Sequence, residues 1–178
     1  MNNYENSKIF NEVKYFKGIV HKDSRGRFEK PFYGETLESE FPHIREVLIS
    51  TSFKNVIRGL HFQTPPYDVK KIIYCTAGRI KDVFIDIRKN SPTYGEFDFS
   101  YLSEEDSHSV LIPEGFAHGF SVLSESATVV YLQSKDFKTE SDKGIHPLSL
   151  DIDWEVDKPV ISDKDLSLPK FEEFDSPW

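Results

Sequence analysis

Hydrophobic residues along this chain fall mostly in short runs that turn-forming residues separate. The runs are rich in Val, Ile, Phe and Tyr, and turn residues such as Ala77-Gly78 and Pro113-Glu114-Gly115 interrupt them. Several runs alternate, so that Asp82, Phe84 and Asp86 are expected to share one face. Many evenly spaced short strands are typical of an all-β sandwich or barrel. The expected strands are 47–52, 71–76, 80–87, 96–102, 110–112, 119–123 and 127–132.

Helices are expected in two short stretches, residues 34–40 and 164–166. Ser162 is a favoured residue type at a helix N-cap, so Asp163-Lys164-Asp165 would ordinarily begin the second helix. The end of the chain, residues 167–178, contains prolines and many acids and is expected to be irregular. No repeat, low-complexity tract or Gly/Ser-rich linker divides the sequence, so residues 1–178 are predicted to form a single domain.

Composition and charge narrow the function classes. The chain has 178 residues, 38% hydrophobic and 29% charged, which is ordinary for a soluble globular protein. The formal net charge of −8 argues against nucleic-acid binding, which needs clustered Lys and Arg, whereas a small phosphorylated ligand needs only a few cations. The single cysteine, Cys75, excludes an intrachain disulfide. The polar start at residues 1–13 and the absence of a long apolar run predict a cytoplasmic protein that does not enter a membrane.

Two segments with histidines are candidates for chemistry. In Arg58-Gly59-Leu60-His61, the histidine could be a general base beside a phosphate-binding arginine, or a partly buried structural histidine. His118 follows Pro113-Glu114-Gly115 and is expected where a tight turn leads into the next strand, which by itself indicates a turn rather than catalysis. The chain contains no His-x-His pair, so a metal site is not expected.

A lysine and a tyrosine beside apolar runs are further candidates. Lys70-Lys71 opens an otherwise apolar strand, so one of the two should point inward, where a lysine needs an anion or a developing negative charge. The alternative is a lysine at the strand end that reaches water. Tyr131 ends an apolar run and could be a core tyrosine or an acid that faces a cavity.

The order of the motifs is more specific than any single motif. Together with Tyr131, these segments strongly resemble the dTDP-4-dehydrorhamnose 3,5-epimerase family over roughly residues 20–166. The resemblance implies a cupin-type fold, which is a double-stranded β-helix or jelly-roll barrel with a few short helices. The segments are 23–28 (Asp-Ser-Arg-Gly-Arg-Phe), 55–63 (Asn-Val-Ile-Arg-Gly-Leu-His-Phe-Gln), 82–88, 91–95 (Ser-Pro-Thr-Tyr-Gly), 112–120 and 162–165.

The resemblance also implies a mechanism that uses neither a metal nor a cofactor. His61 matches the base that removes a proton next to a ketone, and Asp165 matches the carboxylate that orients this base. A carboxylate on one ring nitrogen fixes the tautomer and strengthens the other nitrogen as a base. Lys71 matches the cation near the C4 oxygen, which stabilises the enolate as it forms. Tyr131 matches the acid that returns a proton from the opposite face of the sugar ring.

The resemblance extends to ligand binding. Arg25 matches a phosphate-binding arginine that the N-terminal segment donates across a homodimer. The implied ligand is a nucleotide-diphosphate 4-keto-6-deoxyhexose, and the implied pathway is deoxysugar biosynthesis for cell-surface polysaccharides such as O-antigen. The other positions that match ligand-binding residues are Phe28, Arg58, His118, Lys164 and Asp142, the last where the family commonly has Glu.

Several recognition positions depart from the family pattern. Glu46-Val47-Leu48 stands where the family has Gln-x-Asn, and Lys30 replaces an acid. Val69 replaces a glutamine, and Asp136-Phe137 replaces an aromatic pair. The proton-transfer residues match. The sequence therefore suggests the hypothesis that the reaction class is kept while the sugar, the base or the nucleotide diphosphate differs from dTDP-4-keto-6-deoxyglucose.

The sequence leaves other functions open. The chain could be an epimerase that acts at C3 only, on a CDP-linked or another non-thymidine sugar. It could also be a 3,4-ketoisomerase that acts on nucleotide 4-keto sugars. Arg58–His61 and Tyr131 favour epimerisation over this reaction. From a different class, it could be a non-catalytic sugar-nucleotide binding module, although a binding module needs no base and acid on opposite faces of its ligand.

Overall fold

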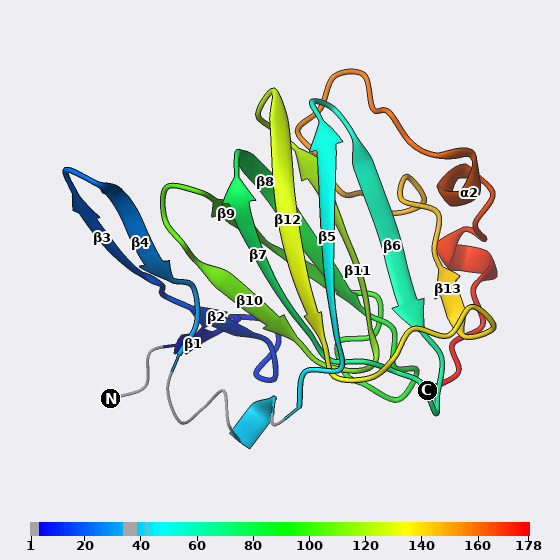
Figure 1. Ribbon diagram of the computed structural model, residues 1–178. Helices are drawn as coiled ribbons and strands as arrows, with labels where there is room; N and C mark the ends of the chain where they lie inside the picture. Colours follow the sequence, from blue (N-terminus) through cyan, green and yellow to red (C-terminus); the bar gives the residue numbers. More distant parts are fainter. Residues whose placement is uncertain (1–3, 34–38, 42) are drawn as a thin grey trace.

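The computed structural model describes residues 4–33, 39–41 and 43–178, and these residues form two facing sheets of antiparallel strands (Figure 1). The six-stranded sheet consists, in spatial order, of β1 (Tyr4–Asn6), β2 (Lys14–Phe16), β10 (Ser109–Ile112), β7 (Lys71–Ala77), β12 (Ser126–Gln133) and β5 (Glu46–Phe53). The five-stranded sheet consists of β13 (Asp142–Gly144), β6 (Ile57–Gln63), β11 (Phe116–Val122), β8 (Arg79–Asp86) and β9 (Phe97–Ser103).

The all-β prediction is confirmed, and each of the seven expected strands overlaps one of β5 and β7 to β12. The prediction missed β6 and the short strands β1 to β4 and β13. It was also wrong about the start of β11. This strand begins at Phe116 and pairs with β8 over its whole length, so His118 lies inside the strand rather than at a turn before it.

The short helix α2 (Asp163–Leu166) forms where it was predicted, and the backbone N–H of Asp165 donates to Ser162 Oγ at 3.1 Å. Most of the other expected helix, residues 34–40, lies outside the described residues. The tail 167–178 is not irregular throughout, because it contains the 3₁₀ helix η1 (Phe171–Glu173). None of the helices in the described ranges is long and apolar enough to cross a membrane.

Each sheet buries one face against the other. In β8 successive side chains point to opposite faces, and both faces are covered. Phe84 packs in the core between the sheets, whereas Val83 and Ile85 pack under the C-terminal segment with Phe171 and Trp178. A sheet covered on both faces accounts for the nearly continuous burial of this strand.

The strands β6 and β11 approach closely because each has a glycine at the contact. Gly59 has a φ of +128°, and a Cβ on it would lie 2.5 Å from the Cα of Gly119. The register shifts at this point, and it places His61 opposite His118 and Arg58 opposite Phe120. The glycines of the two histidine motifs therefore bring Arg58, His61 and His118 to the same face of the sheet, toward the space between the sheets.

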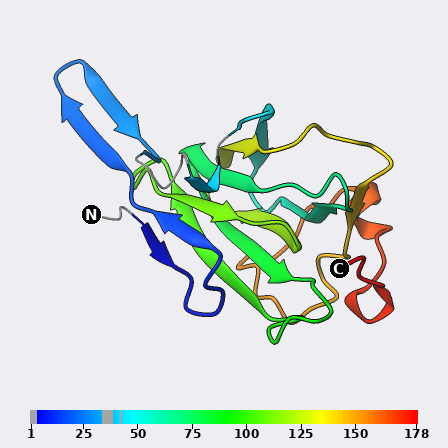
Figure 2. The same cartoon turned by 90° about the horizontal axis from the view of Figure 1, so that it is seen from below.

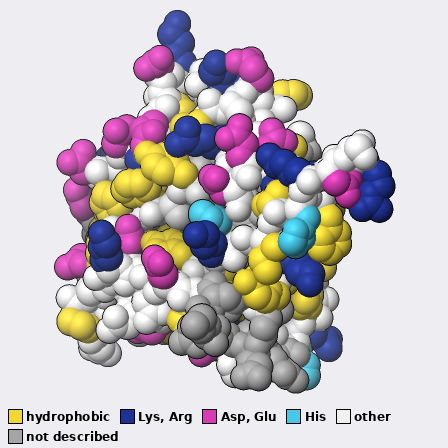
Figure 3. Space-filling view, turned by 90° about the vertical axis from the view of Figure 1, so that its left-hand side faces the viewer, with side chains coloured by type: hydrophobic (Ala, Val, Ile, Leu, Met, Phe, Trp, Pro, Cys, Tyr) yellow, Lys and Arg dark blue, Asp and Glu magenta, His cyan; other side chains and the backbone are white. Residues whose placement is uncertain are grey.

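The hairpin of β3 (Ile19–Asp23) and β4 (Gly26–Lys30) projects away from the two sheets (Figure 1). The C-terminal segment, drawn orange to red, lies on the opposite side of the molecule (Figure 2). Hydrophobic side chains on the hairpin side gather in separate patches with charged side chains between them (Figure 3).

Candidate active site

The residues predicted for proton transfer come from four elements and converge between the two sheets. His61 lies on β6, Lys71 and Tyr131 lie on β7 and β12 of the facing sheet, and Asp165 lies on α2. Arg58 and His118 lie near them, on β6 and β11.

His61 and Asp165 form a hydrogen-bonded pair. The distance from His61 Nε2 to Asp165 Oδ1 is 2.8 Å, and the backbone N–H of Gly59 donates to Asp165 Oδ2 at 3.4 Å. Burial acts to raise the pKa of Asp165, but the hydrogen bond and charge of His61, together with hydrogen bonds from Gly59 and Ser162, hold this pKa below its usual range. Asp165 is therefore ionised and accepts the Nε2 proton. When the imidazole carries a single proton, on Nε2, its lone pair is on Nδ1, which can then act as a base.

Lys71 brings a positive charge next to this base. It is only 9% exposed, and its Nζ donates to the backbone carbonyl of His61 at 3.3 Å. Burial lowers the pKa of Lys71 to about 8, while the negative charges of Asp142 and Asp82 act in the opposite direction. Lys71 is therefore mostly cationic at neutral pH, in a place where solvent screens its charge little.

The Tyr131 side chain reaches the same space from the six-stranded sheet. Its hydroxyl hydrogen-bonds to Ser50 Oγ at 3.2 Å. Burial raises the pKa of Tyr131, and the hydrogen bond with Ser50 and the charge of Arg58 act against this rise. The phenol is therefore protonated at neutral pH, as a proton donor must be.

Arg58 and His118 are fixed by hydrogen bonds on either side of Tyr131. Arg58 Nε donates to Ser52 Oγ at 2.8 Å, and Arg58 is an exposed residue. His118 Nε2 and Asp82 Oδ1 are 2.7 Å apart, and both side chains are buried. The His118 ring packs edge-on against the ring of Tyr131, with centroids 6.1 Å apart.

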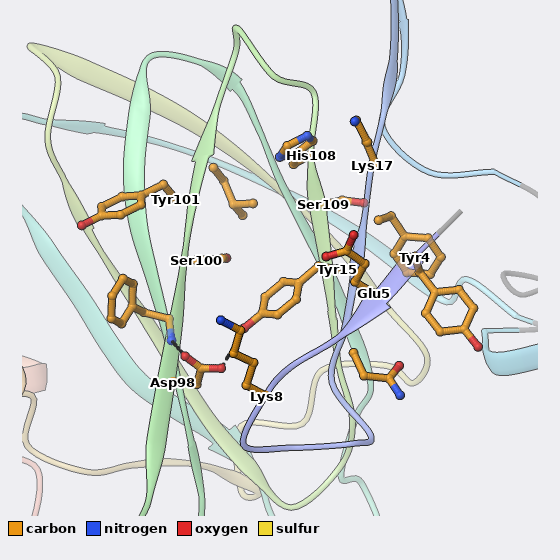
Figure 4. Close-up of a pocket in the computed structure, with 14 residues that line it drawn as sticks. Tyr4, Glu5, Lys8, Tyr15, Lys17, Asp98, Ser100, Tyr101, His108 and Ser109 are labelled. Carbon is orange, nitrogen blue, oxygen red and sulfur yellow. Dashed lines mark hydrogen bonds between the residues drawn. The ribbon is translucent and has the colours of Figure 1, made fainter. Parts of the chain in front are cut away.

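A cavity of about 710 Å³ lies elsewhere, between β1, β2 and β9 (Figure 4). None of the predicted site residues lines it. Its half-buried carboxylate, Asp98, accepts hydrogen bonds from Ser7 Oγ at 2.5 Å and from the Tyr15 hydroxyl at 3.0 Å. These bonds attach the N-terminal segment to β9, so the polar residues of this cavity have a structural role. The site between the sheets remains the candidate active site.

Comparisons with known proteins identify the family. The family model for dTDP-4-dehydrorhamnose 3,5-epimerase matches residues 8–173. The chain belongs to this family. A dTDP-4-dehydrorhamnose 3,5-epimerase of Shigella flexneri is 39% identical over 169 residues, which cover 92% of this chain and 93% of that protein. A dTDP-4-dehydro-6-deoxyglucose 3-epimerase of a Streptomyces species is 31% identical, with 85% of this chain and 80% of that protein covered.

The fold comparison points to the same epimerase family. The crystal structure of a dTDP-6-deoxy-D-glucose-3,5-epimerase from Legionella pneumophila, in complex with dTDP-4-keto-L-rhamnose, matches with a TM-score of 0.90 and 34% identity. The match covers 97% of this chain and 94% of that structure. The predicted cupin-type barrel, the fold of these epimerases, is confirmed.

The remaining predicted ligand-binding residues fall into two groups. Lys164 of α2 and Asp142 of β13 form an ion pair, with Lys164 Nζ 2.6 Å from Asp142 Oδ2, and β13 pairs with the strand β6 that carries His61. Arg25 and Phe28 lie on the projecting hairpin, where the Arg25 side chain is 88% exposed and bonds to Asp23. The structure thus brings the proton-transfer residues together with Arg58 and His118, but not with Arg25 and Phe28 of the same chain.

The structure also places the positions that depart from the family pattern. The register pairs Leu48 with Tyr131, so both side chains face the space between the sheets. Lys30 ends β4 on the hairpin, and Val69 is buried just before β7.

The sequence analysis missed three hydrogen bonds that hold the site. Ser50 bonds to Tyr131, Ser52 accepts from Arg58, and Asp82 pairs with His118. The signal for the serines was available, because Leu48, Ser50 and Ser52 alternate along one strand and therefore share its inner face.

Proposed function

We propose that this family member is a cofactor-independent epimerase that inverts C3, or C3 and C5, of a nucleotide-linked 4-keto-6-deoxyhexose. The observation that carries the proposal is the His61–Asp165 pair on one side of the site and the protonated Tyr131 on the other, with Lys71 beside the base. A base and an acid that approach one carbon from opposite directions are what an inversion requires.

The proposed reaction moves two protons and needs no electron acceptor other than the ketone. His61 Nδ1 removes the proton from the carbon next to C4, and the electron pair moves toward the C4 oxygen to form an enolate. Lys71 stabilises this oxygen, whose charge develops only as the proton leaves. Tyr131 then donates its proton to the carbon from the other face. The imidazolium of His61 and the tyrosinate of Tyr131 return to their starting states by exchange with solvent.

A nucleotide sugar is the proposed ligand. The Legionella pneumophila relative was solved with dTDP-4-keto-L-rhamnose, which supports a nucleotide-linked 4-keto sugar as the substrate class. Leu48 next to Tyr131 offers no hydrogen bond to a ligand, in contrast to the Asn of the family pattern. We therefore propose that recognition of the sugar or the nucleotide differs from that of the thymidine-specific relatives.

We also propose that the enzyme works as a homodimer whose projecting hairpin completes the partner's site. The hairpin presents Arg25 and Phe28 to solvent, 88% exposed at the Arg25 side chain and 58% at Phe28. A cavity of about 390 Å³ on the hairpin is lined by these residues together with His21 and Arg27. A cytoplasmic location and a role in deoxysugar biosynthesis for surface polysaccharides are part of the same proposal.

Two measurements test the proposal. In the first, Ala replaces His61, and both turnover and binding of the nucleotide sugar are measured. An enzyme loses turnover and keeps most of its affinity, whereas a binding module has no turnover to lose. In the second, dTDP-linked and CDP-linked 4-keto-6-deoxyglucose are compared, for the wild type and for Leu48→Asn. Equal use of the thymidine substrate by the wild type and by an ordinary relative would contradict the altered recognition.

Inversion at C3 alone is the second candidate, because the Streptomyces relative is named a 3-epimerase. The product decides between the two. NMR of the product distinguishes a sugar inverted at C3 from one inverted at both carbons, and also detects the 3,4-ketoisomerase product.

A further inference from the structure

The Tyr131 hydroxyl is held by a residue that the sequence did not single out. Tyr131 is half-buried, and its hydroxyl lies 3.2 Å from Ser50 Oγ. Among the residues that the structure describes, Ser50 is the hydrogen-bond partner recorded for this hydroxyl. Either oxygen can be the donor.

Ser50 lies between the Tyr131 hydroxyl and the edge of the sheet. It lies on β5, which is the edge strand of the six-stranded sheet, and it is half-buried. Its neighbours in the strand, Ile49 and Thr51, point to the outer face and are exposed. Ser50 therefore hydrogen-bonds to the proton donor between the sheets and is itself partly exposed to solvent.

We propose that Ser50 positions the Tyr131 hydroxyl and returns a proton from solvent to Tyr131 after each transfer to the substrate. This role rests on the proposed epimerase function. It makes Ser50 a positioning residue, since it acts on the substrate through Tyr131.

In the proposed step, a proton returns to Tyr131 through Ser50. When Tyr131 gives its proton to the carbon, a tyrosinate forms in a buried place. The Ser50 hydroxyl then donates its hydrogen bond to the tyrosinate, and hydrogen bonds to charged groups are stronger than neutral ones. Ser50 passes its proton to the tyrosinate and takes one from a water at the rim. The hydroxide that remains is neutralised by the proton that the imidazolium of His61 releases to solvent, so that Tyr131, Ser50 and His61 are all restored.

The test compares two substitutions on neighbouring residues of one strand. Ser50→Ala removes the hydroxyl that faces Tyr131. Thr51→Val is the matched control, because it removes a hydroxyl that bonds to Thr128 on the outer face at 3.0 Å. Ser50→Thr is the rescue variant, since it keeps a hydroxyl at the same position. Turnover is measured in deuterated water, where NMR follows deuterium uptake and inversion at C3 separately.

We expect Ser50→Ala to lower kcat about 10- to 100-fold, which is the effect of losing a hydrogen bond to a charged group. We also expect more deuterium uptake without inversion, because His61 still removes the proton and returns a deuteron from the same side. Ser50→Thr should restore most of the inversion, and Thr51→Val should behave like the wild type.

Three results would overturn the role of Ser50. The first is that the ratio of deuterium uptake to inversion in Ser50→Ala equals that of the wild type, whether or not kcat falls. A purely structural effect would lower uptake and inversion together and leave their ratio unchanged. The second is the same change of ratio in Thr51→Val. The third is that the wild type itself shows neither deuterium uptake nor inversion. This result would contradict the proposed epimerase function, and it would be known before any variant is compared.

Discussion

The buried ammonium of Lys71 leads to a prediction in which stability and activity move in opposite directions. Lys71 is 9% exposed, and burial lowers its pKa from 10.5 to about 8. Since one pH unit corresponds to 1.36 kcal/mol, keeping this lysine charged in the folded protein costs about 3 kcal/mol. Replacing Lys71 by Met also removes the hydrogen bond to the His61 carbonyl, which contributes about 1 kcal/mol. Lys71→Met keeps the length of the side chain and removes its charge, so it should stabilise the fold by about 2 kcal/mol at pH 7.

The difference in stability between the wild type and Lys71→Met should depend on pH. Below pH 8 Lys71 is protonated in both the folded and the unfolded protein, so the cost is present in full. Between about pH 8 and 10.5 the folded protein loses the proton first, and the wild type becomes more stable relative to the variant. Above 10.5 the lysine is neutral in both states, and the cost of the charge disappears.

Urea unfolding at pH 7 and at pH 10 measures this difference directly. Lys71→Met should have the higher free energy of unfolding at pH 7, and its advantage should shrink at pH 10. Its kcat should fall about 100- to 1000-fold, because the developing charge on the C4 oxygen loses its cation. A variant that is less stable than the wild type at pH 7, or whose advantage is the same at both pH values, would refute the reasoning.

Three further predictions follow from the same structure. Asp165→Asn should lower kcat about 100-fold and change KM little, because a neutral amide cannot stabilise the imidazolium of His61. A loss of kcat below about threefold in steady-state kinetics would contradict this. In a pH–rate profile of the wild type, kcat/KM should fall as the pH rises past about 8, because Lys71 loses its charge there. Lys71→Arg keeps its charge at that pH and should not show this fall. Asp86→Asn should lower the free energy of unfolding in urea by about 3 kcal/mol, because the buried carboxylate accepts hydrogen bonds from Arg88, Ser91 and Thr93; a change below about 1 kcal/mol would speak against it.

The network around Asp86 also explains one of the sequence motifs. Ser91-Pro92-Thr93-Tyr94-Gly95 matched the family, yet its role in the structure is to supply Ser91 and Thr93 to a buried carboxylate. Arg88 of the preceding motif binds the same carboxylate through its side chain and its backbone N–H. Motif order thus identified the family, but it did not distinguish residues that hold the barrel from residues that face the ligand.

The fold could be predicted from the sequence where apolar residues dominate a strand. The runs in β7, β8 and β12 are largely apolar because the sheets cover them. Strand β6 could not be recognised in this way, because Arg58, Gly59 and His61 interrupt its apolar pattern. Each of these residues serves the site or the close approach of β11, so the local pattern fails where function has replaced packing.

The contacts within the site depended on information that the sequence does not carry locally. His61 and Asp165 were predicted to act together because of the resemblance, and the structure places them 2.8 Å apart. The contacts of Tyr131 with Ser50 and His118 depend on the register of β5 and β12 and on how the two sheets face each other. Register across strands so far apart in sequence follows from packing of the whole barrel rather than from any short motif.

Deuterium uptake by the wild-type enzyme tests the central claim most directly. The protein is incubated in deuterated water with dTDP-linked and, separately, CDP-linked 4-keto-6-deoxyglucose, and the sugar protons are followed by NMR. The account predicts that the C3 signal, or the C3 and C5 signals, disappear as the inverted product forms, and that His61→Ala prevents both changes. Binding of these nucleotide sugars without any loss of the C3 or C5 signal would contradict proton abstraction by His61 and favour a binding role for the site.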